Sequence, residues 1–175
     1  MTYTFKFLDK TKSEEYLPAL FDILYRNMMK TMPVGGTYDE NKQFWTSCIA
    51  PEIMAEDRQV ILMYADDELA GYFKYSLSAE GDELAAEDLQ IWERYQKTKL
   101  FGEFFRFMKT VIPPDTEYIK AYTGIQKSNS LSIMEKLGME IVGTNKNGVS
   151  LCLRGKCAPL FDRLQNKGER KAADK

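Results

Sequence analysis

The segment from Glu83 to Gly138 constrains the fold of this chain more than any other part of its sequence. It contains, in order, an apolar strand, a polar turn, an amphipathic helix that stops at Pro113-Pro114, a second strand, and a helix followed by glycine. A helix that connects two successive strands in this way favours a right-handed crossover and parallel strands. A helix that begins just after a strand also offers unpaired amides for binding a phosphate group. The segment therefore predicts a strand–helix–strand crossover with a candidate anion site at the start of its helix.

Hydrophobic periodicity and turn signals place the other elements. A first helix is expected to begin with Ser13 as its N-cap and to end before Pro33. Asn147-Gly148 is a strong hairpin turn signal, and Gly138 suits the left-handed position after a helix. Strands are expected at residues 4–8, 60–64, 69–77, 83–92, 118–123, 140–144 and 149–154, and further helices at 44–49, 100–112 and from 128 or 130 to 137.

This order of elements predicts an α/β fold with a central mixed sheet and helices on both of its faces. The 175 residues are enough for one domain with one sizeable core. We expect residues 1–164 to form that single domain. Residues 165–175 are charged and lack an apolar anchor, so a flexible tail is expected there.

Composition excludes several classes of function. The formal net charge is -2, without the basic stripe that a nucleic-acid-binding protein needs. No apolar run approaches the length of a membrane span, and the first residues lack a signal-peptide core, so a soluble cytoplasmic protein is expected. The chain has no histidine and only three cysteines, irregularly spaced, so neither a metal site nor a histidine-dependent hydrolase is expected.

Two motifs give residues 4–154 a resemblance to the GNAT N-acetyltransferases. The first runs from Leu89 through Ile91-Trp92 and Gln96-Lys97-Thr98-Lys99 to Gly102, and is similar to the strand and pyrophosphate loop of that family. The second runs from Ser130 to Met139 and resembles the family's Tyr-Glu-Lys-Leu-Gly-Phe ending. Its spacing is preserved, whereas the first motif has Lys99 and Phe101 where the family usually has two small residues.

The resemblance implies that the chain has the acyl-CoA N-acyltransferase fold and uses acetyl-CoA. In the family, amides of the first motif hold the CoA pyrophosphate, and an amide at a bulge in the preceding strand binds the acyl carbonyl. By resemblance that amide is the one of Ile91 or Trp92, although Trp92 has an alternative role in packing. Lys97 and Lys99 favour an anion at the helix start, but two lysines also suit an ordinary solvated turn. The implied cofactor-binding residues are Ile91, Trp92, Gln96, Lys97, Thr98, Lys99, Leu100, Phe101, Gly102 and Asn129.

The resemblance also implies candidate catalytic residues. Glu87 lies where some family members have a general base, and partial burial would raise its pKa towards that role; the alternative is a solvated acidic strand end. Met134 replaces the tyrosine that serves the family as general acid. Tyr122, on a neighbouring strand, is the substitute candidate, and a core tyrosine is its alternative role.

The function implied is transfer of an acetyl group from acetyl-CoA to a primary amine of a small molecule or peptide. The alternative is a degenerate domain that binds acyl-CoA or a protein partner without efficient turnover. The resemblance suggests a homodimer. The segment from Met32 to Tyr38 and the pair Phe44-Trp45 are expected to border the acceptor pocket, but they do not identify the acceptor.

Overall fold

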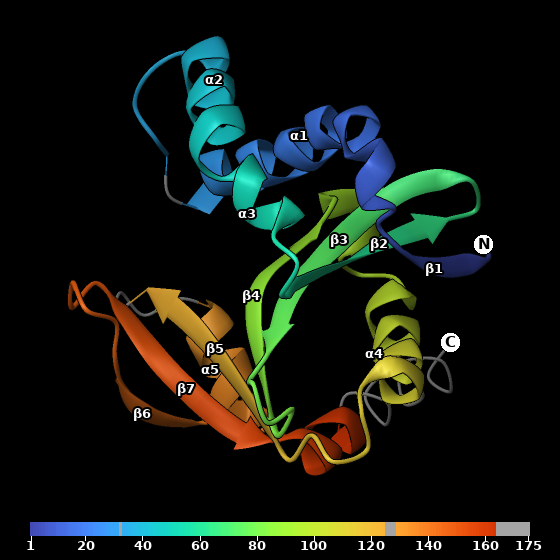
Figure 1. Ribbon diagram of the computed structural model, residues 1–175, viewed down its shortest axis with the longest axis vertical. Coiled ribbons are helices and arrows are strands. Elements are labelled where there is room, and N and C mark those ends of the chain that lie inside the picture. Colours follow the sequence, from blue (N-terminus) through green and yellow to red (C-terminus); the bar gives the residue numbers. More distant parts are fainter. Residues whose placement is uncertain (32, 125–128, 164–175) are drawn as a thin grey trace. The chain divides into compact units, whose positions relative to one another are not determined.

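The computed structural model describes residues 1–31, 33–124 and 129–163 (Figure 1). The tail predicted at residues 165–175 lies outside these residues, as does the helix start considered at Ser128. The strands are β1 (Tyr3–Phe7), β2 (Arg58–Ala65), β3 (Glu68–Leu77), β4 (Glu83–Ile91), β5 (Tyr118–Gly124), β6 (Glu140–Thr144) and β7 (Ser150–Lys156). The α-helices are α1 (Ser13–Thr31), α2 (Tyr38–Cys48), α3 (Ala50–Met54), α4 (Leu100–Val111) and α5 (Asn129–Lys136), with short 3-10 helices η1 (Lys10–Lys12) and η2 (Glu93–Tyr95).

The strands form one mixed seven-stranded sheet in the order β1-β2-β3-β4-β5-β7-β6. Strands β4 and β5 pair in parallel, whereas β1 with β2, β5 with β7, and β6 with β7 pair antiparallel. The predicted mixed sheet and the predicted parallel orientation of β4 and β5 are therefore confirmed. The parallel register runs only from Glu83↔Tyr118 to Ala86↔Ala121, so it ends before either strand does.

The chain divides into two compact units, which are described separately below. The first unit contains residues 1–75 and 88–100, and the second contains residues 76–87 and those from 101 onward. The prediction of a single domain over residues 1–164 stays a prediction.

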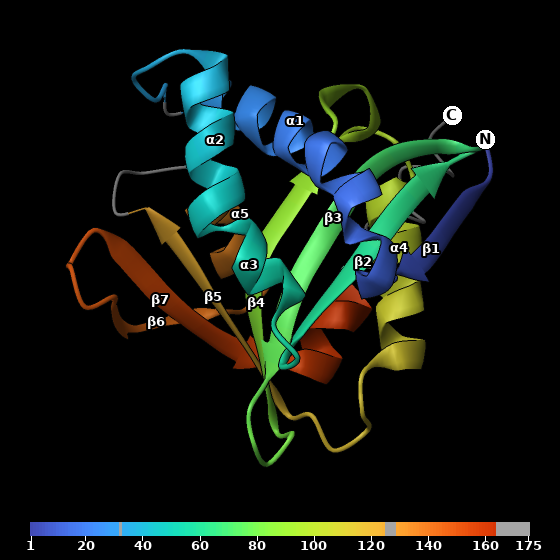
Figure 2. The same ribbon diagram turned by 45° about the horizontal axis from the view of Figure 1, so that its top comes forward.

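In the first unit, helices α1 to α3 lie over β2 and β3 (Figures 1 and 2). The core is made by apolar side chains that the helices and strands bury together, among them Leu20, Ile23, Trp45, Ile53, Val60, Leu62 and Tyr72. Trp45 is only 5% exposed, which suits packing of α2, and its place beside an acceptor pocket stays a prediction. Its indole packs at 5.6 Å, between ring centroids, from Phe21.

Two helix starts in the first unit differ from those predicted. Ser13 adopts helical backbone angles itself, because Asp9 caps the preceding η1 turn by accepting the Thr11 amide. Helix α2 begins at Tyr38 rather than near Phe44, because Thr37 and Glu40 form a capping box. In this box each side chain accepts a hydrogen bond from the backbone amide of the other residue.

In the second unit, α5 ends as its sequence predicts. The Met139 amide donates to the Met134 carbonyl and the Gly138 amide to the Glu135 carbonyl, and Gly138 has φ of 88°. This pattern is the Schellman motif, in which glycine takes the left-handed position. Residues 157–163 are helical, which the sequence reading did not predict. Phe161 from this segment packs at 5.6 Å from the ring of Phe105 in α4.

Among the described residues, strand β6 forms one end of the sheet and pairs only with β7. Figure 2 shows β7 between β5 and β6. All five residues of β6 are exposed, including Ile141 and Val142. The register with β7 shifts between Ile141 and Gly143, which marks a β-bulge.

Candidate functional site

The end of β4 passes unusually close to β3 in the first unit. A Cβ atom at Gly71 would lie 3.1 Å from the Cα atom of Ile91 and closer still to the carbonyl oxygen of Gln90. A glycine in a strand interior often marks such a close approach. The Trp92 amide donates to the Ala70 carbonyl at 2.9 Å. The Trp92 amide is therefore not free to bind an acyl carbonyl. That the Ile91 amide binds this carbonyl stays a prediction.

The turn between β4 and α4 is fixed by two of the predicted cofactor-binding side chains. The Gln96 amide group donates to the Ile91 carbonyl at 2.9 Å. The Thr98 hydroxyl donates to the Tyr95 carbonyl at 2.7 Å and accepts the Leu100 amide at 3.2 Å. The Thr98 hydroxyl therefore pairs the backbone amide of the first residue of α4. Gln96 and Thr98 have structural roles in this turn whether or not a ligand binds.

The other residues of the predicted pyrophosphate segment fall into two kinds. Lys97 and Lys99 are exposed beside the helix start, where a positive side chain adds to the field of the helix dipole. Phe101 packs edge-on against Phe105, with 4.8 Å between ring centroids, and Gly102 is buried. Phe101 packs within α4 and has no charge. Any attraction of the predicted anion by side chains at this helix start therefore comes from the two lysines.

A polar network that the sequence did not reveal surrounds the end of β4. The Tyr72 hydroxyl donates to one carboxylate oxygen of Asp88 at 2.6 Å, and the Gln90 amide group donates to the other at 2.7 Å. Asn27 from α1 donates to the Gln90 side-chain oxygen at 2.9 Å and to the Ile91 carbonyl at 3.1 Å. Burial first, and the charge of Asp88 next, raise the pKa of Tyr72, so Tyr72 stays a hydrogen-bond donor. The network orients Asn27 and the carbonyl of Ile91.

Beside this network the first unit has an open pocket of about 640 Å³. Its volume lies within the range typical of small-molecule sites. The pocket is formed by α1 and by the residues that follow β4. Its lining residues are Tyr25, Arg26, Asn27, Met29, Lys30, Trp92, Glu93 and Arg94.

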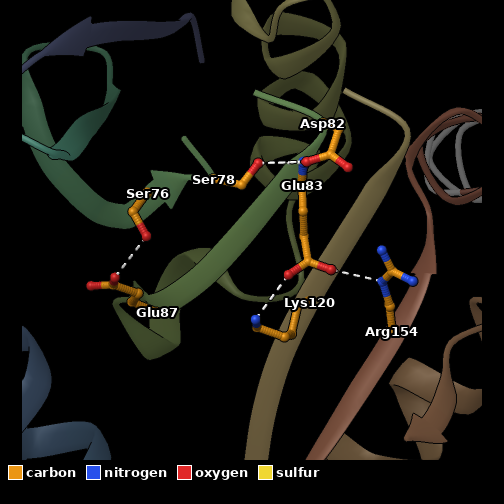
Figure 3. A network of polar contacts seen from close by, with 7 residues as sticks. All are labelled: Ser76, Ser78, Asp82, Glu83, Glu87, Lys120 and Arg154. Carbon is orange, nitrogen blue, oxygen red and sulfur yellow. Dashed lines mark hydrogen bonds and ion pairs between the residues drawn. The ribbon is translucent and has the colours of Figure 1, made fainter. Parts of the chain in front are cut away.

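Both predicted catalytic residues lie in the second unit. Glu87 is exposed, and its carboxylate accepts a hydrogen bond from the Ser76 hydroxyl at 3.0 Å (Figure 3). This exposure fits the alternative of a solvated strand end, and the role of Glu87 as a base stays a prediction. Tyr122 is 49% exposed and pairs in register with Cys152, so a role as a core tyrosine is wrong. Hydrogen bonding to Cys152 is the main cause that raises the pKa of Tyr122, which keeps its phenol protonated at neutral pH.

A separate ion-pair network in the second unit links β4, β5 and β7. Its central residue, Glu83, lies four positions before Glu87. The carboxylate of Glu83 accepts hydrogen bonds from Lys120 at 2.8 Å and from Arg154 at 2.7 Å (Figure 3). The Arg154 guanidinium also lies 3.7 Å from the centre of the Tyr118 ring. The hydrogen bond from Lys120 is the first cause that lowers the pKa of Glu83.

The lowered pKa of Glu83 predicts a pH-dependent contribution to stability. A carboxyl group with a depressed folded-state pKa stabilises the protein above its unfolded pKa of about 4.3, and the contribution is lost as pH falls through the folded value. Because the three side chains are partly exposed, we expect Glu83→Gln to cost roughly 1 kcal/mol at pH 7. Urea unfolding from pH 7 to pH 3 measures this difference. A cost that does not shrink towards pH 3 contradicts the assignment.

The second motif lies on α5 in the second unit. Asn129 is the first residue of α5, and nothing is described of its side chain. Met134 is half-buried, and its backbone carbonyl takes part in the Schellman motif. Its thioether cannot donate a proton, so the family's usual acid has no equivalent at this position.

The seven-stranded mixed sheet, with α4 between the parallel strands β4 and β5 in the chain, matches the fold of the GNAT acetyltransferases. No family model and no curated protein sequence matches the chain. Similar solved structures include a PaiA N-acetyltransferase from Thermoplasma acidophilum in complex with coenzyme A (15% identity, 89% of this chain and 99% of that chain, TM-score 0.65). Another is an aminoglycoside 6'-acetyltransferase type Ii (18% identity, 89% of this chain and 98% of that chain, TM-score 0.61). A third is described as a GNAT-family acetyltransferase from Desulfovibrio desulfuricans (13% identity, 90% of this chain and 100% of that chain, TM-score 0.63).

At these identities the comparison establishes a shared fold. Within the described ranges, no helix combines the length and apolar character needed to cross a membrane.

Proposed function

We propose that this chain is a member of the GNAT family and transfers an acetyl group from acetyl-CoA to a primary amine of a small molecule or peptide. The observation that carries the proposal is the connection from β4 to α4, in which Thr98 orders the helix start and Lys97 and Lys99 are exposed beside it. The first amides of a helix lack intrahelical partners and favour an anion, as the CoA pyrophosphate requires. Likeness to acetyltransferases over about nine-tenths of the chain supports it.

The proposed reaction needs neither histidine nor a metal. The acceptor ammonium gives one proton to a base and its nitrogen attacks the thioester carbonyl carbon. An N–C bond forms, the C–S bond breaks, the nitrogen loses its second proton, and CoA leaves as a thiolate that takes up a proton. The net products are an amide, CoA thiol and one free proton.

The proposed roles follow the sequence prediction as modified by the geometry. Glu87 is the base and Tyr122 the acid that protonates the thiolate. The Ile91 amide is assigned to the acyl carbonyl. Because the Thr98 and Leu100 amides already donate to the Tyr95 carbonyl and the Thr98 hydroxyl, the other amides from Lys97 to Gly102 are assigned to the pyrophosphate. Asn129 is assigned to a further contact with CoA. A cytoplasmic location and a homodimer stay predictions.

Binding of CoA is the direct test of the proposed function. Isothermal calorimetry with CoA and acetyl-CoA, followed by a thiol-release assay over a panel of amines, measures binding and turnover separately. A ligand that binds only the folded state raises its stability by about 2.7 kcal/mol at a hundredfold excess over Kd, so a thermal shift is expected as well. Absence of binding by both methods overturns the proposal.

Reversing the two lysines at the start of α4 should weaken CoA binding. We expect the double variant Lys97→Glu and Lys99→Glu to raise the Kd for CoA by roughly tenfold or more at low salt, because attraction to the pyrophosphate becomes repulsion. The effect is expected to shrink as salt screens these exposed charges. The matched control is Lys146→Glu, an exposed lysine in the β6–β7 turn. An unchanged Kd in the double variant removes the pyrophosphate from this helix start.

A second function is favoured by specific observations. The chain has Met134 where the family has its acid, Phe101 where it has a small residue, and a Trp92 amide that already donates to Ala70. These features suit a domain that binds acyl-CoA or a protein partner without efficient turnover. CoA binding without thiol release over a broad amine panel would identify this alternative.

A further inference from the structure

The pocket beside the end of β4 in the first unit has a basic lining. Among its described lining residues, three are cations, namely Arg26, Lys30 and Arg94, and one is a carboxylate, Glu93. Two of the cations are already paired. Lys30 forms an ion pair with Glu93, and Arg94 forms one with Glu68.

Arg26 differs from the other two cations. No ion pair joins Arg26 to a carboxylate among the described residues, and its guanidinium instead lies 5.4 Å from the centre of the Trp92 ring. The acid one helical turn earlier, Asp22, accepts the hydroxyl of Tyr38. A cation–π contact with an indole helps to hold a guanidinium while leaving its N–H donors available. Arg26 is therefore a pre-positioned cation in the pocket.

The chemistry of Arg26 selects the kind of molecule that fits beside it. Arginine presents a fork of donors that matches a carboxylate with two parallel hydrogen bonds. The excess positive charge of the lining would repel a polycationic acceptor such as an aminoglycoside. A molecule that carries both an amine and a carboxylate satisfies Arg26 and brings its amine into the pocket that Asn27 and Trp92 line.

We propose that the acceptor is a primary amine that also bears a carboxylate, as in an amino acid, and that Arg26 binds this carboxylate in the pocket. The inference rests on the proposed acetyl transfer and names its substrate class. Arg26 would act as a specificity-determining residue and takes no part in proton transfer.

The test uses three amines that differ only at the carboxylate: leucine, leucinamide and 3-methylbutylamine. Thiol release with acetyl-CoA gives kcat/KM for each with the wild-type chain and with Arg26→Met, Arg26→Lys and the control Lys146→Met. We expect Arg26→Met to lower kcat/KM for leucine by about tenfold to a hundredfold, the range for losing a charged hydrogen bond. The values for the other two amines should change little, and Arg26→Lys should recover part of the loss.

A second measurement does not depend on turnover. Trp92 lines the pocket and is half-buried, whereas Trp45 is in the core, so a carboxylate bound at Arg26 is expected to change Trp92 emission. Titration with leucine should alter the fluorescence of the wild-type chain, and the response should disappear in Trp92→Phe and weaken in Arg26→Met.

The outcomes separate this inference from the proposed function. Binding of CoA with leucine selectivity that depends on Arg26 supports both. Turnover that favours the uncharged amines, or an equal effect of Arg26→Met on all three, overturns the inference and leaves acetyl transfer standing. A leucine-dependent Trp92 response without any binding of CoA overturns the proposed function and the acceptor role of the amine, and leaves only a carboxylate site at Arg26. Absence of that response in the wild-type chain overturns the inference.

Discussion

Gly71→Ala is expected to destabilise the protein by roughly 3 kcal/mol, the upper part of the range for overpacking a well-packed interior. The added methyl group would meet backbone atoms of Gln90 and Ile91 rather than the end of a flexible side chain. Relief therefore requires β3 and β4 to move apart at the place where the Trp92 amide bonds to Ala70. Urea unfolding followed by circular dichroism measures the free energy of unfolding.

Gly143→Ala is the matched control for this change. Gly143 also lies in a strand and has no positive φ, and a Cβ atom added to it would lie more than 4 Å from every heavy atom outside its two chain neighbours. Its effect is expected to stay within about 0.5 kcal/mol, as for most substitutions away from packed features. Equal effects at the two positions would contradict the close approach of β3 and β4.

Glu87→Gln is expected to lower kcat/KM roughly a hundredfold if Glu87 is the general base, which is the usual range for such a group. The substitution keeps the shape of the side chain and its hydrogen bond to Ser76 but removes its ability to accept a proton. CoA affinity should be unchanged, because the proposed pyrophosphate contacts lie elsewhere. Thiol release with the best amine of the panel provides the measurement.

Glu80→Gln serves as the control, since Glu80 is an exposed acid in the turn between β3 and β4. Wild-type activity in Glu87→Gln would remove Glu87 from the chemistry. Asp88 would then be the next carboxylate to test with Asp88→Asn, although Tyr72 and Gln90 already occupy both of its oxygens. If neither change matters, the rate comes mainly from positioning of the two substrates.

Local signals in the sequence predicted most of the fold. Gly138 and the hydrophobic stripe of α4 mark their elements because the determinants lie within one or two helical turns. The start of α2 was missed although its signal, Thr37 followed by Glu40, was present in the sequence. The helix at residues 157–163 was missed because it is short. Its few apolar residues are buried by packing against side chains such as Phe105, which the sequence alone does not reveal.

The candidate site was less predictable, because its geometry depends on contacts between distant parts of the chain. Asn27 reaches Gln90 and Ile91 across 63 and 64 positions of sequence. No periodicity or motif at Asn27 indicates that contact. Likewise, the hydrogen bond of the Trp92 amide follows from the pairing of β3 with β4, which the order of the strands suggests but does not specify to the residue.

The irregular edge of the sheet has a consequence for how this chain behaves at high concentration. Within the part of the chain that the structure describes, no strand pairs with the outer edge of β6, where Ile141 and Val142 are exposed, and such an edge favours aggregation by strand addition. The bulge before Gly143 twists that edge, so a straight foreign strand can match only part of it. The same irregularity that interrupts pairing with β7 therefore protects the chain against forming extended intermolecular sheets.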